Sequence, residues 1–156
     1  MRSRGPSRRR FLGAATGVAV TSALAGCLGN GDDGTDPTAD EDDPAAWEDV
    51  REIRLMGYTR GWVGDEPELI DGITNPTIVL FEGEEYEITW ENGDGGRHNI
   101  EIWDEEDAVV DGLATDLVTQ RGATQSIQFT ASPEAHQYVC EPHFRTMVGY
   151  FRHAGD

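Results

Sequence analysis

The chain has 156 residues, and its 30 acidic side chains against 12 basic ones give a formal net charge of -18. This length is typical of one domain with one hydrophobic core, so a second domain is not expected. A surface this acidic repels phosphate backbones, which argues against nucleic-acid binding.

All 12 basic residues are arginines, and lysine is absent. Dense carboxylates keep a protein soluble where high salt screens their mutual repulsion. This composition resembles that of proteins from salt-loving archaea. The resemblance concerns the habitat and does not specify a fold.

The first 26 residues predict a targeting segment that does not belong to the fold. Residues 7–12 (SRRRFL) carry a twin-arginine export signal, and the apolar run at 11–25 is short and rich in glycine and alanine for a membrane span. Residues 24–27 (LAGC) resemble the lipobox at which a prolipoprotein is cleaved and lipidated on its cysteine. We therefore expect Cys27 to anchor the exported protein to the extracytoplasmic face of the cell membrane. An ordinary cleaved signal with an incidental cysteine is the alternative.

Residues 27–46 predict an acidic flexible tether. They contain hardly any apolar side chains, so they cannot bury enough surface to offset the entropy of ordering. Repulsion between like charges should extend the tether and hold the domain away from the membrane.

Residues 47–156 predict an all-β domain, because short β-prone runs alternate with turn residues and show little helical periodicity. Their number and size indicate a Greek-key β-sandwich of about seven to eight strands. Segments 61–75 and 105–120 have no clear pattern, and either could hold a helical turn or an irregular loop. The predicted strands cover residues 51–58, 77–81, 86–90, 99–103, 126–130, 136–140 and 148–151.

Alternation along two of these strands predicts that His98 and Cys140 point inward. Successive strand residues face opposite sides, so His98 shares its face with Ile100 and Ile102, and Cys140 shares its face with Tyr138. Both residues lie at strand ends, which places them at the rim of the core, where loops can build a small site.

Cys140 needs an explanation, because the only other cysteine is the predicted lipidation site Cys27. A lone thiol in an oxidising compartment is a liability unless it is buried or bound to a metal.

Cys140, His143 and Met147 lie within eight positions, and His98 lies upstream at a strand start. Two histidine nitrogens and a cysteine sulfur in one plane, with a long weak bond to methionine, form the site of electron-transfer copper.

From about residue 75 to residue 151 the chain resembles a cupredoxin, in particular plastocyanin, halocyanin and their small blue copper relatives. The resemblance implies a cupredoxin-like fold with one type 1 copper held by His98, Cys140, His143 and Met147. It also implies that the Asn99 side chain ties the ligand loops together. The segments that carry the likeness are Gly83 before a strand ending Trp90-Glu91-Asn92, then His98-Asn99, Cys140-Glu141-Pro142-His143 and Met147-Val148-Gly149.

One spacing departs from the family pattern. Three residues separate His143 from Met147, whereas plastocyanin-like members usually have four and amicyanin-like members two. The loop is therefore intermediate between the two patterns, and Met147 is the ligand whose match is incomplete. Taken singly, each candidate ligand also has an ordinary explanation, such as a cysteine or methionine that fills the core.

The resemblance implies a carrier of single electrons that shuttles between Cu(I) and Cu(II). It is not expected to be an enzyme, because four protein ligands leave no open position for a substrate. Expected partners are respiratory complexes of the membrane or copper oxidases and reductases, and the chain is expected to be a monomer. Two alternatives stay open: a copper-binding protein for storage or delivery, and a copper-free interaction domain that has kept the sandwich.

Overall fold

The computed structural model describes residues 43–155, and β-strands make up the regular structure of this range apart from three short 3-10 helices. The all-β prediction is therefore confirmed. No helix between residues 43 and 155 is both long and apolar enough to cross a membrane. The predicted signal segment, the lipidation site Cys27 and residues 27–42 of the predicted tether lie outside the described residues.

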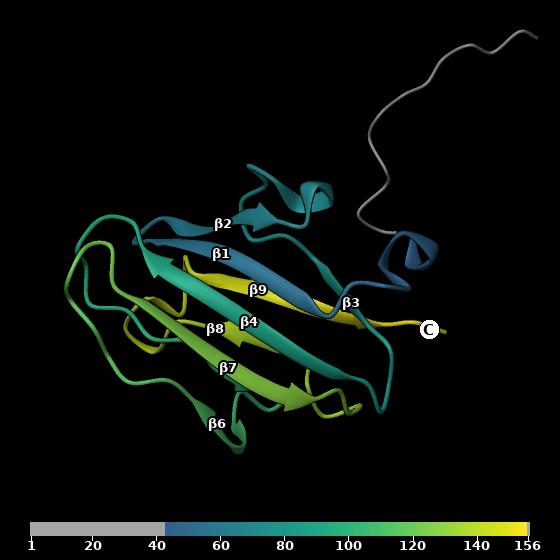
Figure 1. The fold of residues 1–156 in the computed structure, drawn as a ribbon. Helices are drawn as coiled ribbons and strands as arrows, with labels where there is room; N and C mark the ends of the chain where they lie inside the picture. The colour runs from purple at the N-terminus through teal and green to yellow at the C-terminus, as the bar shows by residue number, and fades with distance from the viewer. Residues whose placement is uncertain (1–42, 156) are drawn as a thin grey trace, which may run out of the picture. The chain divides into compact units, whose positions relative to one another are not determined.

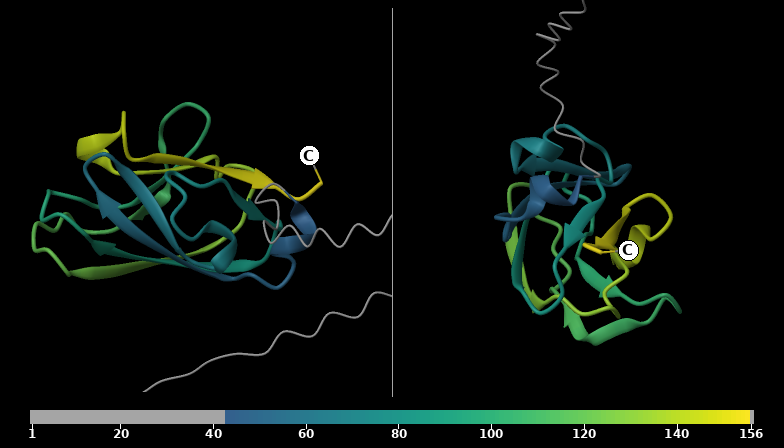
Figure 2. Two further views of the ribbon diagram at one scale, coloured as in Figure 1. Left: turned by 90° about the horizontal axis from the view of Figure 1, so that it is seen from above. Right: turned by 90° about the vertical axis from the view of Figure 1, so that its right-hand side faces the viewer.

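Within residues 43–155, nine strands form two mixed sheets that lie face to face (Figures 1 and 2). The first sheet has the order β2-β1-β4-β7 and the second β3-β9-β8-β5-β6; the β1–β4 and β3–β9 pairs are parallel, and the others are antiparallel. The strands are β1 (Glu52–Tyr58), β2 (Gly61–Glu66), β3 (Ile78–Leu80), β4 (Glu85–Asn92), β5 (Glu101–Trp103), β6 (Val109–Ala114), β7 (Thr124–Thr130), β8 (Gln137–Val139) and β9 (Val148–His153).

The helices η1 (Pro44–Trp47), η2 (Glu68–Ile70) and η3 (Glu141–His143) are single turns. The domain boundary predicted at residue 47 lies inside η1, where the Asp43 side chain accepts a hydrogen bond from the Ala45 amide and Trp47 is fully buried. The helix η3 lies in the loop between β8 and β9 and carries His143.

Two strands were not predicted, so the described range holds nine strands where about seven to eight were expected. In segment 61–75, β2 forms a hairpin with β1, and η2 supplies the helical turn that was one of the alternatives. Gly61 and Gly64 interrupt the apolar pattern of β2, and glycine is depleted in strands. In segment 105–120, β6 is an edge strand whose register with β5 shifts, and Asp111 and Gly112 adopt positive φ values of 46° and 73°. Such irregular edges leave little period-2 signal in a sequence.

The core lies between the sheets and is built from alternate residues of the strands. Tyr86, Ile88 and Trp90 of β4 are buried, as are Ile127 and Phe129 of the neighbouring strand β7. These residues give one face of the first sheet to the core, because side chains two positions apart point the same way.

The site predicted from the sequence falls at one end of this sandwich. The loop that follows β4 leads to His98, which forms an isolated bridge with Val118, and the loop that joins β8 to β9 holds Cys140 and His143. Both loops lie at the end away from the C-terminus (Figure 1). The topology therefore brings together residues that are more than 40 positions apart.

Candidate metal centre

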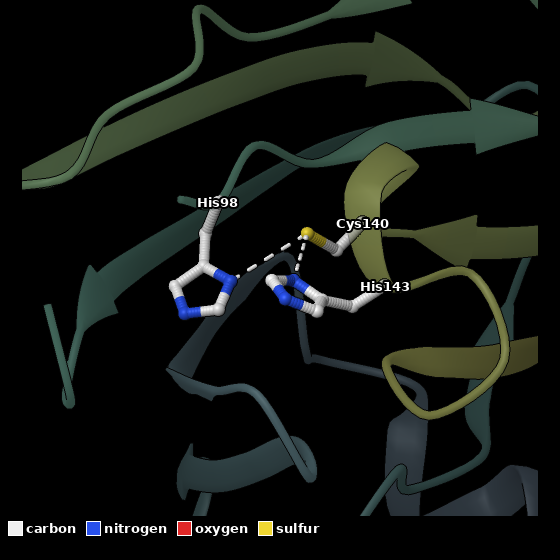
Figure 3. Close-up of side chains that lie close together, drawn as sticks. All are labelled: His98, Cys140 and His143. Carbon is white, nitrogen blue, oxygen red and sulfur yellow. Dashed lines mark hydrogen bonds between the residues drawn. The ribbon is translucent and has the colours of Figure 1, made fainter. Parts of the chain in front are cut away.

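Three side chains that can bind a metal converge on one point (Figure 3). The Cys140 Sγ lies 3.6 Å from the Nδ1 of His98 and 3.6 Å from the Nδ1 of His143. All three donor atoms lie within 4.8 Å of one another. His98 and Cys140 are fully buried and point inward as predicted, whereas His143 is partly exposed.

The spacing of this donor set fits a metal ion. Two ligands of one ion with bond lengths of about 2.0 to 2.3 Å lie about 3.5 to 3.8 Å apart, which matches both sulfur–nitrogen distances. A thiolate with two imidazoles is the donor set of type 1 copper, so the group fits one such ion.

The loop between β8 and β9 holds Cys140 and His143 in a closed turn. The His143 amide donates to the Cys140 carbonyl at 2.9 Å, and the Cys140 amide donates to the Met147 carbonyl at 3.0 Å. Pro142 lies inside η3, where its fixed φ suits the first helical positions. The two ligands are therefore set by backbone hydrogen bonds as well as by packing.

Met147 is fully buried and belongs to the same loop. Its amide donates to the His143 carbonyl at 2.8 Å, and its Cε lies 3.5 Å from where a Cβ on Gly57 would stand. The three-residue spacing from His143 thus leaves Met147 inside the core, against β1. Its role as the fourth ligand remains a prediction.

Asn99 joins the two loops that carry the candidate ligands. Its Oδ1 accepts a hydrogen bond from the Glu141 amide at 2.9 Å, across 42 residues of sequence. Its Nδ2 donates to Glu101 at 3.0 Å, and the side chain is almost fully buried. The hydrogen bond from the Glu141 amide joins the two loops, and a role of Asn99 beside a bound metal stays a prediction.

Asp94 was not predicted as a residue of the site, yet it contacts a candidate ligand. Its Oδ1 lies 2.8 Å from the Nε2 of His98, on the ring edge opposite Cys140. The sequence predicted no site residue between Asn92 and Gly96. An aspartate four positions before a histidine gave no further signal, because such a contact depends on how the loop folds back.

Gly96 lets this loop approach the His98 ring. A Cβ at position 96 would stand 2.6 Å from the His98 Nε2 and 3.0 Å from the Asp94 Oδ1. Real Cβ atoms do not come so close to ring atoms, so any larger residue would displace the ring or the carboxylate.

The protonation states of the site follow from burial and hydrogen bonding. Burial raises the pKa of the Cys140 thiol above its ordinary value of 9.0, although the backbone amides of Asn99 and His143 oppose the rise. Burial, followed by the proximity of His98, lowers the pKa of His143 below its ordinary value of 6.5. Burial alone would raise the pKa of Asp94, but hydrogen bonds from Thr59, His98 and Gly96 outweigh it and lower that pKa. Near neutral pH the metal-free site therefore holds a thiol, a neutral His143 and an Asp94 carboxylate.

Comparison with known proteins identifies related chains. The model of the family described as copper binding proteins, plastocyanin/azurin family, matches residues 75–152, which make up half of the chain and include all four predicted ligands. None of the curated proteins compared with the chain matches it.

Three of the solved structures that are similar to this chain share low sequence identity with it. Rusticyanin from Thiobacillus ferrooxidans is 21% identical, with 66% of this chain and 76% of that chain covered and a TM-score of 0.47. Auracyanin from Roseiflexus castenholzii is 17% identical, with 67% and 98% covered and a TM-score of 0.47. An oxidised amicyanin variant is 18% identical, with 69% and 85% covered and a TM-score of 0.42.

The pKa directions predict how many protons leave when a metal binds. We expect Cu(I) binding near pH 7 to release about one proton, from Cys140, because a neutral imidazole binds without losing one to solvent. As the pH falls through the lowered pKa of His143, its ring becomes charged, so the number should rise toward about two and the affinity should fall. Anaerobic calorimetry of the Cys27→Ser chain, in buffers of different ionisation enthalpy, measures the number. For Cys140→Ser in the same background, the number of protons released on binding should fall by about one, because the thiol is absent. Binding near pH 7 without proton release would contradict the predicted states.

Proposed function

This chain belongs to the plastocyanin/azurin family of copper-binding proteins, and we propose that it carries single electrons through one type 1 copper. The observation that carries the proposal is the Cys140 sulfur, buried and 3.6 Å from each of two histidine nitrogens. When bound, copper supplies a one-electron couple, Cu(I)/Cu(II). His98, Cys140 and His143 would hold the copper, with Met147 as the proposed fourth ligand.

The protein's contribution is to keep these ligands in one arrangement in both oxidation states. Sulfur favours Cu(I), while imidazole suits both states, so a fixed mixed set reduces the rearrangement that electron transfer requires. The burial of His98, Cys140 and Met147 excludes water from the proposed centre. Asn99 and the backbone bonds of residues 140–147 resist movement of the loops.

The ring of His143 is the proposed path for the electron, because His143 is the one partly exposed member of the donor group. Phe144 follows it, is 50% exposed and lies beneath the Arg145 guanidinium, whose Cζ is 5.5 Å from the ring centroid. An exposed aromatic ring next to His143 offers apolar area that a partner can cover near the proposed electron path. We propose that Phe144 and the edge of His143 form the surface on which redox partners dock.

The proposed partners are membrane respiratory complexes, or copper oxidases and reductases, with a basic docking face. The formal net charge of -18 favours such a face, although high salt weakens the steering. The proposed location, outside the cell membrane and held by a lipid on Cys27, rests on the sequence of residues 7–27 alone. A tether of this kind would restrict the search for partners to the membrane surface.

The spectrum of the copper-loaded chain tests the proposed function. With Cu(II) we expect intense thiolate-to-copper absorption and narrow copper hyperfine splitting in electron paramagnetic resonance, because the Cys140 sulfur shares the unpaired electron. Both features should be lost in Cys140→Ser. A pale spectrum with ordinary splitting would favour copper storage or delivery instead, and a chain that binds no copper would leave an interaction domain.

Substitution of Phe144 tests the docking surface. Phe144→Asp should slow electron exchange with a redox partner about tenfold or more, equivalent to roughly 1.4 kcal/mol of lost encounter stability, while the copper spectrum stays unchanged. The control is Tyr150→Asp, which introduces the same charge at a comparably exposed aromatic of β9. The same slowing in both variants, measured by stopped-flow mixing, would assign the effect to charge and not to this surface.

Replacement of Cys27 tests the proposed anchor. In cells that export the chain, Cys27→Ser should move it from the membrane fraction to the soluble extracytoplasmic fraction, because the acceptor of the lipid is removed. Immunoblots of the two fractions measure the distribution. A Cys27→Ser chain that still carried a lipid, as measured by mass spectrometry, would exclude Cys27 as the anchor.

A further inference from the structure

We propose that Asp94 is a positioning residue for His98, which fixes the direction of the ring and lowers the reduction potential of the copper centre. This inference rests on the proposed function for the copper itself. The contact between Asp94 and the His98 ring is present in the structure and does not depend on bound copper.

The geometry places Asp94 and Cys140 on opposite edges of one imidazole. The Asp94 Oδ1 lies 2.8 Å from Nε2, and the Cys140 Sγ lies 3.6 Å from Nδ1. A carboxylate accepts hydrogen bonds, so this contact places the ring proton on Nε2 and leaves the lone pair of Nδ1 directed toward the sulfur and the proposed copper. A metal-binding histidine whose other nitrogen is held in this way has both its tautomer and its orientation set.

The carboxylate is itself held by three further hydrogen bonds. The Thr59 amide and hydroxyl donate to Oδ2 at 2.7 and 2.8 Å, and the Gly96 amide donates to Oδ1 at 2.8 Å. The Asp94 side chain is 31% exposed, whereas His98 is fully buried. With four donors around two oxygens, Asp94 stays an anion and cannot turn away from the ring without losing these bonds.

Thr59 extends the same network to the second ligand loop. Its carbonyl accepts a hydrogen bond from the Thr146 hydroxyl at 2.6 Å, and the Thr146 carbonyl accepts one from Asn75 at 2.9 Å. Thr59 lies in the turn between β1 and β2, before residues 75–152, which the family model matches. This hairpin, which carries no candidate ligand, therefore joins the loop of His98 to the loop of Cys140 and His143.

The charge of Asp94 gives the direction of its effect on the potential. A carboxylate that accepts a hydrogen bond from an imidazole raises the basicity of its other nitrogen. A more basic ligand, with a negative charge beside it, stabilises Cu(II) more than Cu(I). Asp94 should therefore lower the reduction potential, and its removal should raise it.

The matched control for charge is Glu141. Glu141 is exposed, follows Cys140 directly, and is near enough for its charge to raise the pKa of that thiol. Its carboxylate has no hydrogen bond to a candidate ligand in the part of the chain that the structure describes. Glu141→Gln therefore removes one negative charge near the centre without touching an imidazole.

The first test is voltammetry of the full copper-loaded chain with Asp94→Asn or Glu141→Gln. We expect both variants to shift the potential upward, and the Asp94→Asn shift to be at least about twice the Glu141→Gln shift, because only Asp94 acts through a ligand. Equal shifts, or no shift in Asp94→Asn, would overturn the proposal.

The second test needs no copper and separates this proposal from the proposed function. Nitrogen-15 NMR of the metal-free wild-type chain should show the His98 proton on Nε2, and Asp94→Ala should populate the Nδ1-protonated form. A wild-type His98 protonated on Nδ1, or a tautomer unchanged in Asp94→Ala, would overturn the proposal. If the chain bound no copper but the tautomer depended on Asp94, the proposed function would fail, while the positioning of His98 would stand.

Discussion

The structure depends on one constraint: two loops, distant in sequence, must hold the Cys140 sulfur between two imidazole nitrogens. Neither loop can do this alone, because His98 follows β4 of the first sheet and Cys140 follows β8 of the second. The two sheets fix where the loops begin, and the Asn99 and Thr59 contacts fix how they meet. The two sheets thus set the positions of the loops, and a few hydrogen bonds at this end of the sandwich fix how the candidate ligands lie relative to one another.

Three buried polar side chains at this end, those of Asn92, Asn99 and His98, have hydrogen-bond partners, which explains how they can be buried against an apolar core. The Asn92 side chain accepts a hydrogen bond from the Gly95 amide and donates one to the Gly96 carbonyl. The Asn99 side chain accepts from the Glu141 amide and donates to Glu101. The His98 ring contacts Asp94 and Cys140. A buried polar group without a partner costs about 1 to 3 kcal/mol. The pairing therefore makes the candidate centre compatible with exclusion of water and also makes it stiff.

Much of this could be predicted from the sequence, and the failures have physical causes. Alternation placed His98 and Cys140 inward, because a period of two reports burial directly, and spacing grouped Cys140 with His143. The strands β2 and β6 were not predicted, because glycines in β2 and the irregular edge position of β6 weaken the period of two. Asp94 escaped because its role depends on three-dimensional contacts with Thr59 and Gly96, and no local pattern encodes a loop that folds back onto a ring.

The position of β9 links the candidate centre to the integrity of its sheet. The strand lies in the interior of the sheet, between β3 and β8. The strand β3 pairs with β9 at the sheet edge, while β8 pairs with both β9 and β5. The loop that carries Cys140 and His143 is closed by the pairing of β8 with β9, so a substitution that unpairs residues 148–153 would disturb the ligand loop together with the sheet.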